Sequence, residues 1–121
     1  MRLPALAIAL VLSPLPAGAQ SLEEHAARAM RPFEHTLQPG AVAEECVRLE
    51  AGRSRAFEWT ADGSLDFNIH FHRGKDVSYP VKLRNETKGK GKFTASSTQD
   101  YCWMWTARFP TKLTGTLGPE E

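Results

Sequence analysis

The sequence predicts an all-β protein, an antiparallel β-sandwich of about seven strands with a short N-terminal helix. Three observations favour this fold class. From Ala43 onward, apolar and polar residues alternate with a period of two, turn-forming residues interrupt the alternation at short intervals, and aromatic residues share one face of several segments. Strands that are apolar on one face bury that face against a second layer, which favours a sandwich over an open sheet.

The first nineteen residues have the three parts of a secretory signal peptide. Arg2 provides a positive charge, residues 3–15 form an apolar segment, and Ala17-Gly18-Ala19 offers small residues for cleavage. The apolar segment is shorter than the roughly 20 residues that a membrane-spanning helix needs. We therefore expect cleavage near Ala19 and a periplasmic or secreted mature chain without a transmembrane segment.

The charge balance bears on the class of partner. The chain has 15 basic and 14 acidic residues, so removal of Arg2 with the signal peptide leaves 14 of each. A nearly neutral domain does not bind nucleic acid through its overall charge. We expect a signal peptide over residues 1–19, a helix and linker over 20–41, and one sandwich domain over 42–121.

The N-terminal part of the mature chain contains a capping pattern. Ser21 and Glu24 have the spacing of a capping box, which predicts a helix over residues 21–31 that ends before Pro32. Residues 33–41 contain a Pro-Gly pair and no sustained periodicity. This segment is expected to be a linker.

Seven short strands are expected around residues 43–49, 56–59, 65–72, 77–83, 93–95, 101–106 and 112–117. The clearest is 65–72, in which odd-numbered residues are apolar and even-numbered residues are polar. Asp62-Gly63 is expected to form a turn before this strand, and Pro80 places the next strand at a sheet edge. Residues 84–92 are expected to form a polar loop.

The two cysteines, Cys46 and Cys102, predict a disulfide, because an exported chain reaches an oxidising compartment. Both lie opposite the large apolar residues of their own strands. They would then share a face of one sheet, and the bridge would join neighbouring or nearly neighbouring strands. The alternative is two buried free thiols.

Four segments together resemble the Golgi-dynamics (GOLD) domain, found in the lumenal part of eukaryotic cargo receptors. They are Cys46-x-x-Leu49-x-x-Gly52, residues 65–72, Gly91-x-Phe93-x-Ala95 and the aromatic segment 101–105. The resemblance implies a GOLD-like, jelly-roll-like sandwich over residues 42–117, similar to small bacterial exported proteins, and a compact interaction module. Thr106 replaces the family's usual Asn, and no transmembrane helix follows, so the cargo-receptor role is not implied.

A metal site is one candidate function. His70 and His72 point the same way from one strand, so Cu or Zn could bind there. The further ligand would be Met104, on the non-aromatic face of another strand, or Asp66, on the same face as the histidines. Two histidines are fewer than the three or four protein ligands of a tight site. The alternative is a solvated or hydrogen-bonded face of a half-buried strand.

A cationic segment is a second candidate. Residues 82–92 contain five basic residues and the single acid Glu86, and Lys88, Lys90 and Lys92 could contact an anionic partner. The alternative is a loop charged for solubility and for protection of a sheet edge.

The aromatic residues Trp59, Tyr101, Trp103 and Trp105 have two interpretations: a buried core, or an exposed binding face. No catalytic motif accompanies the four histidines, so we expect no enzyme activity. The expected function is therefore an exported, non-enzymatic module that binds a protein or envelope component. The alternative is a periplasmic Cu- or Zn-binding protein that uses His70 and His72.

Overall fold

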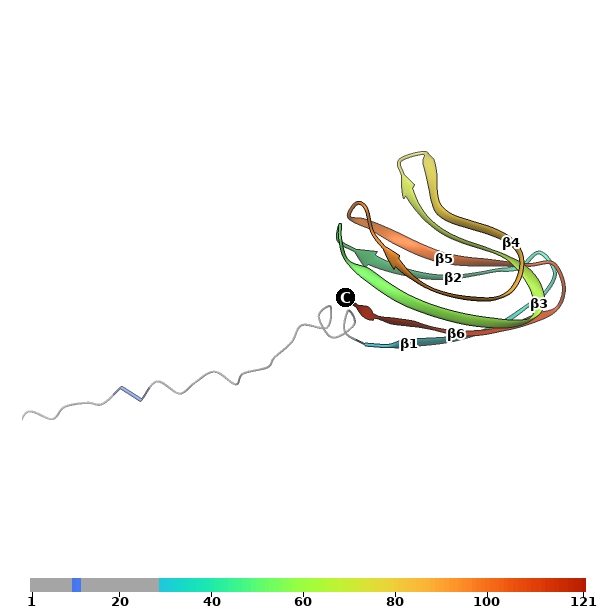
Figure 1. Cartoon of the computed structure of the whole chain (residues 1–121), viewed down its shortest axis with the longest axis horizontal. Helices are drawn as coiled ribbons and strands as arrows, with labels where there is room; N and C mark the ends of the chain where they lie inside the picture. The colour runs from blue at the N-terminus through green and yellow to red at the C-terminus, as the bar shows by residue number, and fades with distance from the viewer. Residues whose placement is uncertain (1–9, 12–28) are drawn as a thin grey trace, which may run out of the picture.

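The computed structural model describes residues 10–11 and 29–121, and its regular structure is a set of antiparallel β-strands (Figure 1). The strands are β1 (Arg31–Leu37), β2 (Val42–Leu49), β3 (Ser54–Arg73), β4 (Asp76–Thr94), β5 (Gln99–Ala107) and β6 (Thr111–Glu120). The predicted all-β, antiparallel fold class is confirmed. Six strands replace the predicted seven, because β3 and β4 each combine two predicted strands and β1 is an additional one.

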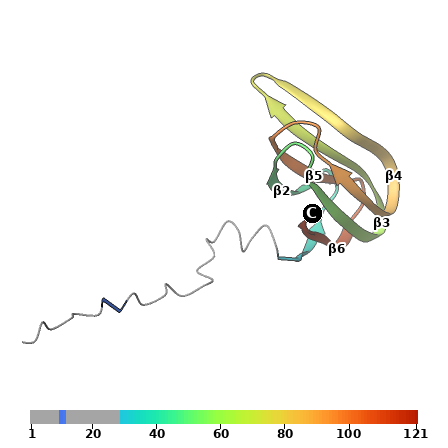
Figure 2. The ribbon, with the colours of Figure 1, turned by 60° about the vertical axis from the view of Figure 1, so that its left-hand side comes forward.

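The strands follow the order β1-β6-β3-β5-β2, and β4 pairs with the remaining edge of β3. The first half of β3 pairs with β6 over residues 55–61, and its second half pairs with β5 over residues 65–70. A single strand therefore belongs to both layers. Figures 1 and 2 show the result, a strongly curled sheet in which the β1–β6 and β2–β5 pairs face each other across the core.

The corner of the sheet lies where β3 leaves β6 and joins β5. The turn predicted at Asp62-Gly63 is wrong, because the chain continues as β3 through these residues. The Asp62 carboxylate accepts a hydrogen bond of 2.7 Å from the backbone N–H of Lys112. A Cβ atom on Gly63 would lie 2.6 Å from the Thr111 hydroxyl, so this corner requires glycine. An Asp-Gly pair serves here to bend a strand rather than to reverse it.

The polar loop predicted over residues 84–92 is also wrong, because β4 continues through it to Thr94. Gly89 and Gly91 lie opposite Trp59 and Phe57 of β3 in the register. A Cβ atom on Gly89 would lie 2.6 Å from Cε2 of Trp59. The glycines therefore provide room for two aromatic rings of the neighbouring strand. In the sequence alone, the same glycines suggested a flexible loop.

Trp59, Tyr101, Trp103 and Trp105 lie in the core, so these four residues do not form an exposed binding face. Tyr101, Trp103 and Trp105 of β5 are fully buried, and Trp59 of β3 is 1% exposed. The Trp105 ring lies 5.5 Å from that of Phe67 and 6.2 Å from that of Trp59, between centroids. Their alternation along β3 and β5 therefore marks the inner face of the curled sheet, as the period-two pattern predicts.

The segment predicted as a linker contains β1. Phe33 and Leu37 are buried, and the β1 backbone pairs with β6 along its whole length. Phe33 lies opposite Gly115, whose lack of a side chain leaves room for the ring. The alternation was short and interrupted by His35, so the sequence alone did not reveal this strand. Most of the predicted signal peptide and most of the predicted helix over 21–31 lie outside the described residues, but Arg31 already belongs to β1.

The predicted disulfide between Cys46 and Cys102 is confirmed. The two residues lie directly opposite each other in the β2–β5 register, with Cα atoms 4.0 Å apart. The bridge joins neighbouring strands on the outer face of one layer, as the strand parity predicted. A persistent disulfide fits an exported protein. Among the described residues there is no helix long and apolar enough to span a membrane.

Candidate functional site

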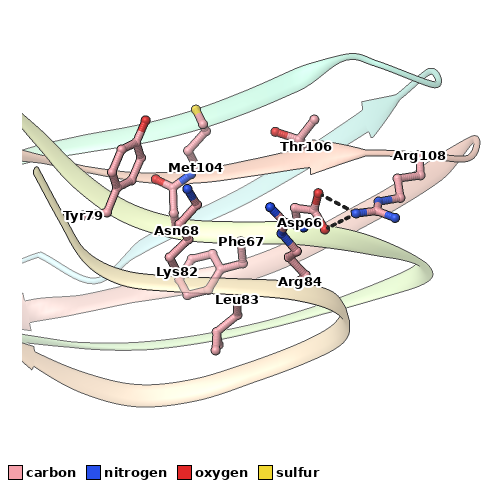
Figure 3. Close-up of a pocket in the computed structure, with 10 residues that line it drawn as sticks. All are labelled: Asp66, Phe67, Asn68, Tyr79, Lys82, Leu83, Arg84, Met104, Thr106 and Arg108. Atoms are coloured by element: carbon pink, nitrogen blue, oxygen red, sulfur yellow. Dashed lines mark hydrogen bonds and ion pairs between the residues drawn. The ribbon is translucent and has the colours of Figure 1, made fainter. Parts of the chain in front are cut away.

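The outer face of β3, β4 and β5 contains a hollow with a cavity volume of about 380 Å³ (Figure 3). We call it the outer hollow, because it lies on the face opposite the aromatic core. It is lined by Asp66, Phe67, Asn68, Tyr79, Lys82, Leu83, Arg84, Met104, Thr106 and Arg108. β3 and β5 provide the floor, and β4 provides one wall.

Two bulges in β4 shape that wall. One residue of β3 lies opposite two residues of β4 at Tyr79 and Pro80, and again at Arg84 and Asn85. A bulge bends its strand and changes the direction of a side chain. Tyr79 and Arg84 both line the hollow, so each bulge contributes one of the lining residues. Asn85 has a positive φ of 55°, a conformation that Asn tolerates better than most residues.

Asp66 is held in place on the floor of the hollow. Arg108 donates hydrogen bonds of 3.1 and 3.0 Å to its two carboxylate oxygens, and the backbone N–H of Asn85 donates a third of 3.2 Å. Burial alone would raise the pKa of Asp66, but the hydrogen bonds from Arg108 and Asn85, with the nearby positive charges, lower it below its ordinary value. Asp66 is therefore an ionised anchor for Arg108.

The outer hollow has an excess of positive charge. Lys82, Arg84 and Arg108 are three cations against the single carboxylate of Asp66, which leaves two positive charges. The Lys82 ammonium lies 4.8 Å from the centroid of the Tyr79 ring, a cation–π contact. Within the part of the chain that the structure describes, neither Lys82 nor Arg84 has a carboxylate within 4.0 Å. The hollow can therefore accept an anionic group.

The residues of the predicted metal site lie on the same outer face. The rings of His70 and His72 are 5.2 Å apart between centroids, and Met104 pairs with Asn68 in the β3–β5 register. His70 is only 4% exposed, so it is far more buried than a solvated strand face would allow. Its Nδ1 donates a hydrogen bond of 2.7 Å to Oδ1 of Asn68. Met104 lines the outer hollow, whereas neither histidine does.

Among the described residues, one group of three acidic, histidine or cysteine side chains has ligand atoms within 4.8 Å of one another. It consists of Glu44, Cys46 and Cys102. The two sulfur atoms are joined in the disulfide, so they are not available as thiolate ligands in this form. Sequence analysis did not single out Glu44, because its position beside Cys102 depends on the pairing of β2 with β5.

The lysines of the predicted cationic segment lie in β4 outside the hollow. Lys88 and Lys90 lie opposite Thr60 and Glu58 in the register, and Lys92 forms an ion pair with Glu121. Two of the three lysines thus have an acidic residue opposite or in contact. They form a charged strand surface, which is a common protection of a sheet edge.

Sequence analysis missed the two arginines that line the hollow, Arg84 as a binding residue and Arg108 altogether. Arg84 counted only toward the charge of the segment 82–92. The polar residues of strand 65–72 signalled an outer face, but the partners across that face come from segments distant in the sequence. Bulges, which leave no clear sequence signature, decide which β4 side chains reach it.

No family model matches the chain, and no curated protein matches it in sequence. Solved structures with a similar fold exist. The Yersinia pseudotuberculosis-derived mitogen has 9% sequence identity, and the match covers 76% of this chain and 86% of the mitogen with a TM-score of 0.51. The likeness is one of fold.

Two further structures match over similar lengths. A periplasmic inhibitor of g-type lysozyme from Aeromonas hydrophila, PliG, has 12% identity over 73% of this chain and 85% of the inhibitor, with a TM-score of 0.48. A de novo designed double-stranded β-helix has 20% identity over 75% of this chain and 99% of the design, with a TM-score of 0.39.

Proposed function

We propose that this protein is an exported, non-enzymatic interaction module, and that the outer hollow binds an acidic side chain of a protein partner. The observation that carries the proposal is the uncompensated pair of cations, Lys82 and Arg84, at the wall of a preformed hollow. Arg108 is held at the opposite side by Asp66. A carboxylate entering the hollow would thus meet several donors that are already positioned.

The rim of the hollow favours a protein partner. The aromatic side chain of Tyr79 is 44% exposed and the apolar side chain of Leu83 is 45% exposed. Protein interfaces are enriched in Tyr and Arg, and they combine apolar contact area with a few charged anchors. The disulfide and the long β3–β4 pair hold this surface on hydrogen-bonded strands, which reduces the entropy lost on binding.

The chemistry of the hollow supports a binding role over catalysis. The carboxylate of Asp66 has a lowered pKa and is engaged by Arg108, so it is a poor general base. Thr106 is the hollow's only hydroxyl besides that of Tyr79, and no histidine lines the hollow to activate it. We propose further that the chain reaches the periplasm after cleavage near Ala19, and that its sandwich is related to the GOLD domain.

The test uses a fluorescein-labelled poly-glutamate peptide and fluorescence anisotropy at low and at physiological salt. We expect Lys82→Gln/Arg84→Gln to weaken binding at least about tenfold, equivalent to about 1.4 kcal/mol. The matched control is Lys88→Gln/Lys90→Gln, which removes the same charge from the same strand outside the hollow.

Equal losses of peptide affinity in the two double variants would mean that β4 attracts the peptide through its overall charge. The proposal that the hollow is the binding site would then be wrong. A peptide that does not bind the unmodified protein would contradict an acidic partner. Binding of a poly-lysine peptide of the same length to the unmodified protein would also contradict an acidic partner, because the positive charge of the hollow repels cations.

A second candidate function is metal binding by His70 and His72, with Met104 as a possible third ligand. It is favoured by the fixed orientation of His70, since an outer partner such as Asn68 commonly orients a ligating imidazole. Calorimetric titration of the oxidised protein with Cu(II) and then Zn(II), beside His70→Ala/His72→Ala, tests it. Heat that disappears in the double variant supports metal binding, and no heat or equal heat rejects it.

A further inference from the structure

We propose that Glu44, Cys46, Cys102 and His70 form a redox-gated zinc site, closed while the disulfide is intact and able to bind zinc once it is reduced. The proposal concerns a different set of atoms from the outer hollow. It also differs from a His70–His72 site, because it requires the two sulfur atoms and does not require His72.

The four side chains come from three neighbouring strands, and three of them form a cluster that the fourth, His70, adjoins. The ligand atoms of Glu44, Cys46 and Cys102 all lie within 4.8 Å of one another. His70 pairs with Cys102 in the β3–β5 register, and its Nε2 lies 3.6 Å from Oε1 of Glu44. Glu44, Cys46 and Cys102 thus form a three-ligand cluster on the outer face, and His70 adjoins this cluster through Glu44. The ring of His70 lies outside the 4.8 Å cluster, so it has to move closer to the sulfur atoms when the disulfide opens.

The orientation of His70 suits a metal ligand. Since an amide oxygen only accepts hydrogen bonds, the 2.7 Å contact with Asn68 Oδ1 places the proton of the ring on Nδ1. Nε2 is then the nitrogen with a free lone pair, and it is the one that faces Glu44.

The chemistry of the donors selects the metal. Two thiolates, one imidazole nitrogen and one carboxylate oxygen are a four-ligand set of the kind that zinc takes in a tetrahedral site. The strands provide the spacing, because directly paired residues project their side chains side by side from one face. Asn68 acts as a positioning residue, since its amide oxygen accepts the hydrogen bond from Nδ1 of His70.

The redox step is a thiol–disulfide exchange with a dithiol reductant. A thiolate of the reductant attacks the sulfur of Cys46, which is exposed, whereas Cys102 is 9% exposed. The S–S bond breaks, and a second thiolate of the reductant resolves the mixed disulfide. The reductant is oxidised to a disulfide and the protein gains two electrons and two protons as Cys46 and Cys102 thiols. Zinc binding then displaces these two protons.

The experiment measures zinc affinity of the purified protein with and without a phosphine reductant, against a chromophoric chelator as competitor. We expect the reduced protein to bind zinc at least about 100-fold more tightly than the oxidised protein, because two ligands are gained. Cobalt(II) replaces zinc in a parallel titration, in which thiolate ligands produce a charge-transfer absorption band.

The variants separate this site from its neighbours. Cys46→Ala/Cys102→Ala and Glu44→Gln/His70→Ala are expected to lose the tight binding, whereas His72→Ala is the matched control and is expected to keep it. Asn68→Ala is expected to weaken binding by about 10–100-fold. Asn68→Asp, whose oxygen also accepts the Nδ1 proton, is expected to restore it.

Several results would overturn the proposal. They are equal zinc affinity of the two redox forms, tight binding that survives removal of both cysteines, and a cobalt spectrum without a thiolate band. Reduction could also unfold the chain, so tryptophan fluorescence and circular dichroism accompany each titration. An unfolded reduced chain that refolds on addition of zinc supports the site, and one that stays unfolded contradicts it.

Discussion

The carboxylate of Glu45 on β2 lies 2.9 Å from the imidazole of His35 on β1 and joins two strands that stand at opposite ends of the strand order. Its other oxygen accepts a 2.7 Å hydrogen bond from Arg31, which also donates to the backbone carbonyl of Cys46. Glu45 is 8% exposed, whereas Arg31 is exposed and His35 is half-buried, so the cluster lies where the interior meets the surface. Side chains therefore close the end of the curled sheet at which backbone pairing stops.

Glu45→Gln is expected to lower the free energy of unfolding by about 1–3 kcal/mol, because the buried charged acceptor of two hydrogen bonds is lost. Urea denaturation followed by tryptophan fluorescence measures the change. The matched control is Glu34→Gln on β1, whose ion pair with Lys112 is exposed on both sides. The control is expected to change stability by less than about 0.5 kcal/mol. Equal effects would show that Glu45 is no more than a surface charge.

Gly89→Val is expected to destabilise the fold by about 1–3 kcal/mol, because the added side chain would collide with the indole of Trp59. Gly91→Ala is the graded comparison, since its Cβ atom would lie 3.1 Å from the edge of the Phe57 ring and needs a smaller adjustment. Thermal unfolding measures both. A fully tolerated Val would mean that residues 84–92 leave the sheet, as a loop would.

We expect the free energy of unfolding to decrease in mild acid because the imidazole of His70 is buried. Burial lowers its pKa below the ordinary 6.5, so below about pH 6.5 the unfolded chain takes up a proton that the folded protein does not. The stability associated with neutral His70 is present above this pH and decreases as the pH falls toward the lowered folded pKa.

The pH prediction is tested by comparing the protein with His70→Gln in urea titrations between about pH 7 and about pH 5. The variant is expected to lose less stability over this range. Identical pH dependence in the two proteins would contradict a lowered pKa at this position. His72→Gln is expected to reduce the pH dependence less than His70→Gln does, because the His72 imidazole lowers the pKa of His70 only as a smaller cause than burial.

Removal of the disulfide is expected to cost about 4 kcal/mol on the chain-entropy account, since Cys46 and Cys102 are 56 residues apart. Cys46→Ala/Cys102→Ala, denatured beside the oxidised protein without metal, measures this cost. A much smaller loss would indicate that the β2–β5 pairing already restricts the unfolded chain. The same variant then provides the metal-free reference for the zinc titrations.

Much of the candidate site was visible in the sequence as separate parts. The period-two pattern placed His70, Asn68 and Asp66 on one face, and the parity of Cys46 and Cys102 placed the disulfide on a face of one sheet. Neither pattern contains the register between distant strands. Arg108 reaches Asp66, and Glu44 reaches Cys102, only because β5 pairs with both β3 and β2.

The sequence by itself determined the all-β class and the inner aromatic face of β3 and β5, because alternation fixes which face of a strand is buried. It also predicted the disulfide, because the two cysteines belong to a chain with the pattern of a signal peptide. Only the tertiary structure decided that β3 continues through its Asp-Gly pair, that β4 replaces a loop, and that β1 belongs to the sheet. In each case the local sequence, a glycine or a short alternation, is compatible both with a strand and with a turn, loop or linker. The neighbour that packs against it, Thr111, Trp59 or Gly115, selects one of them through steric fit.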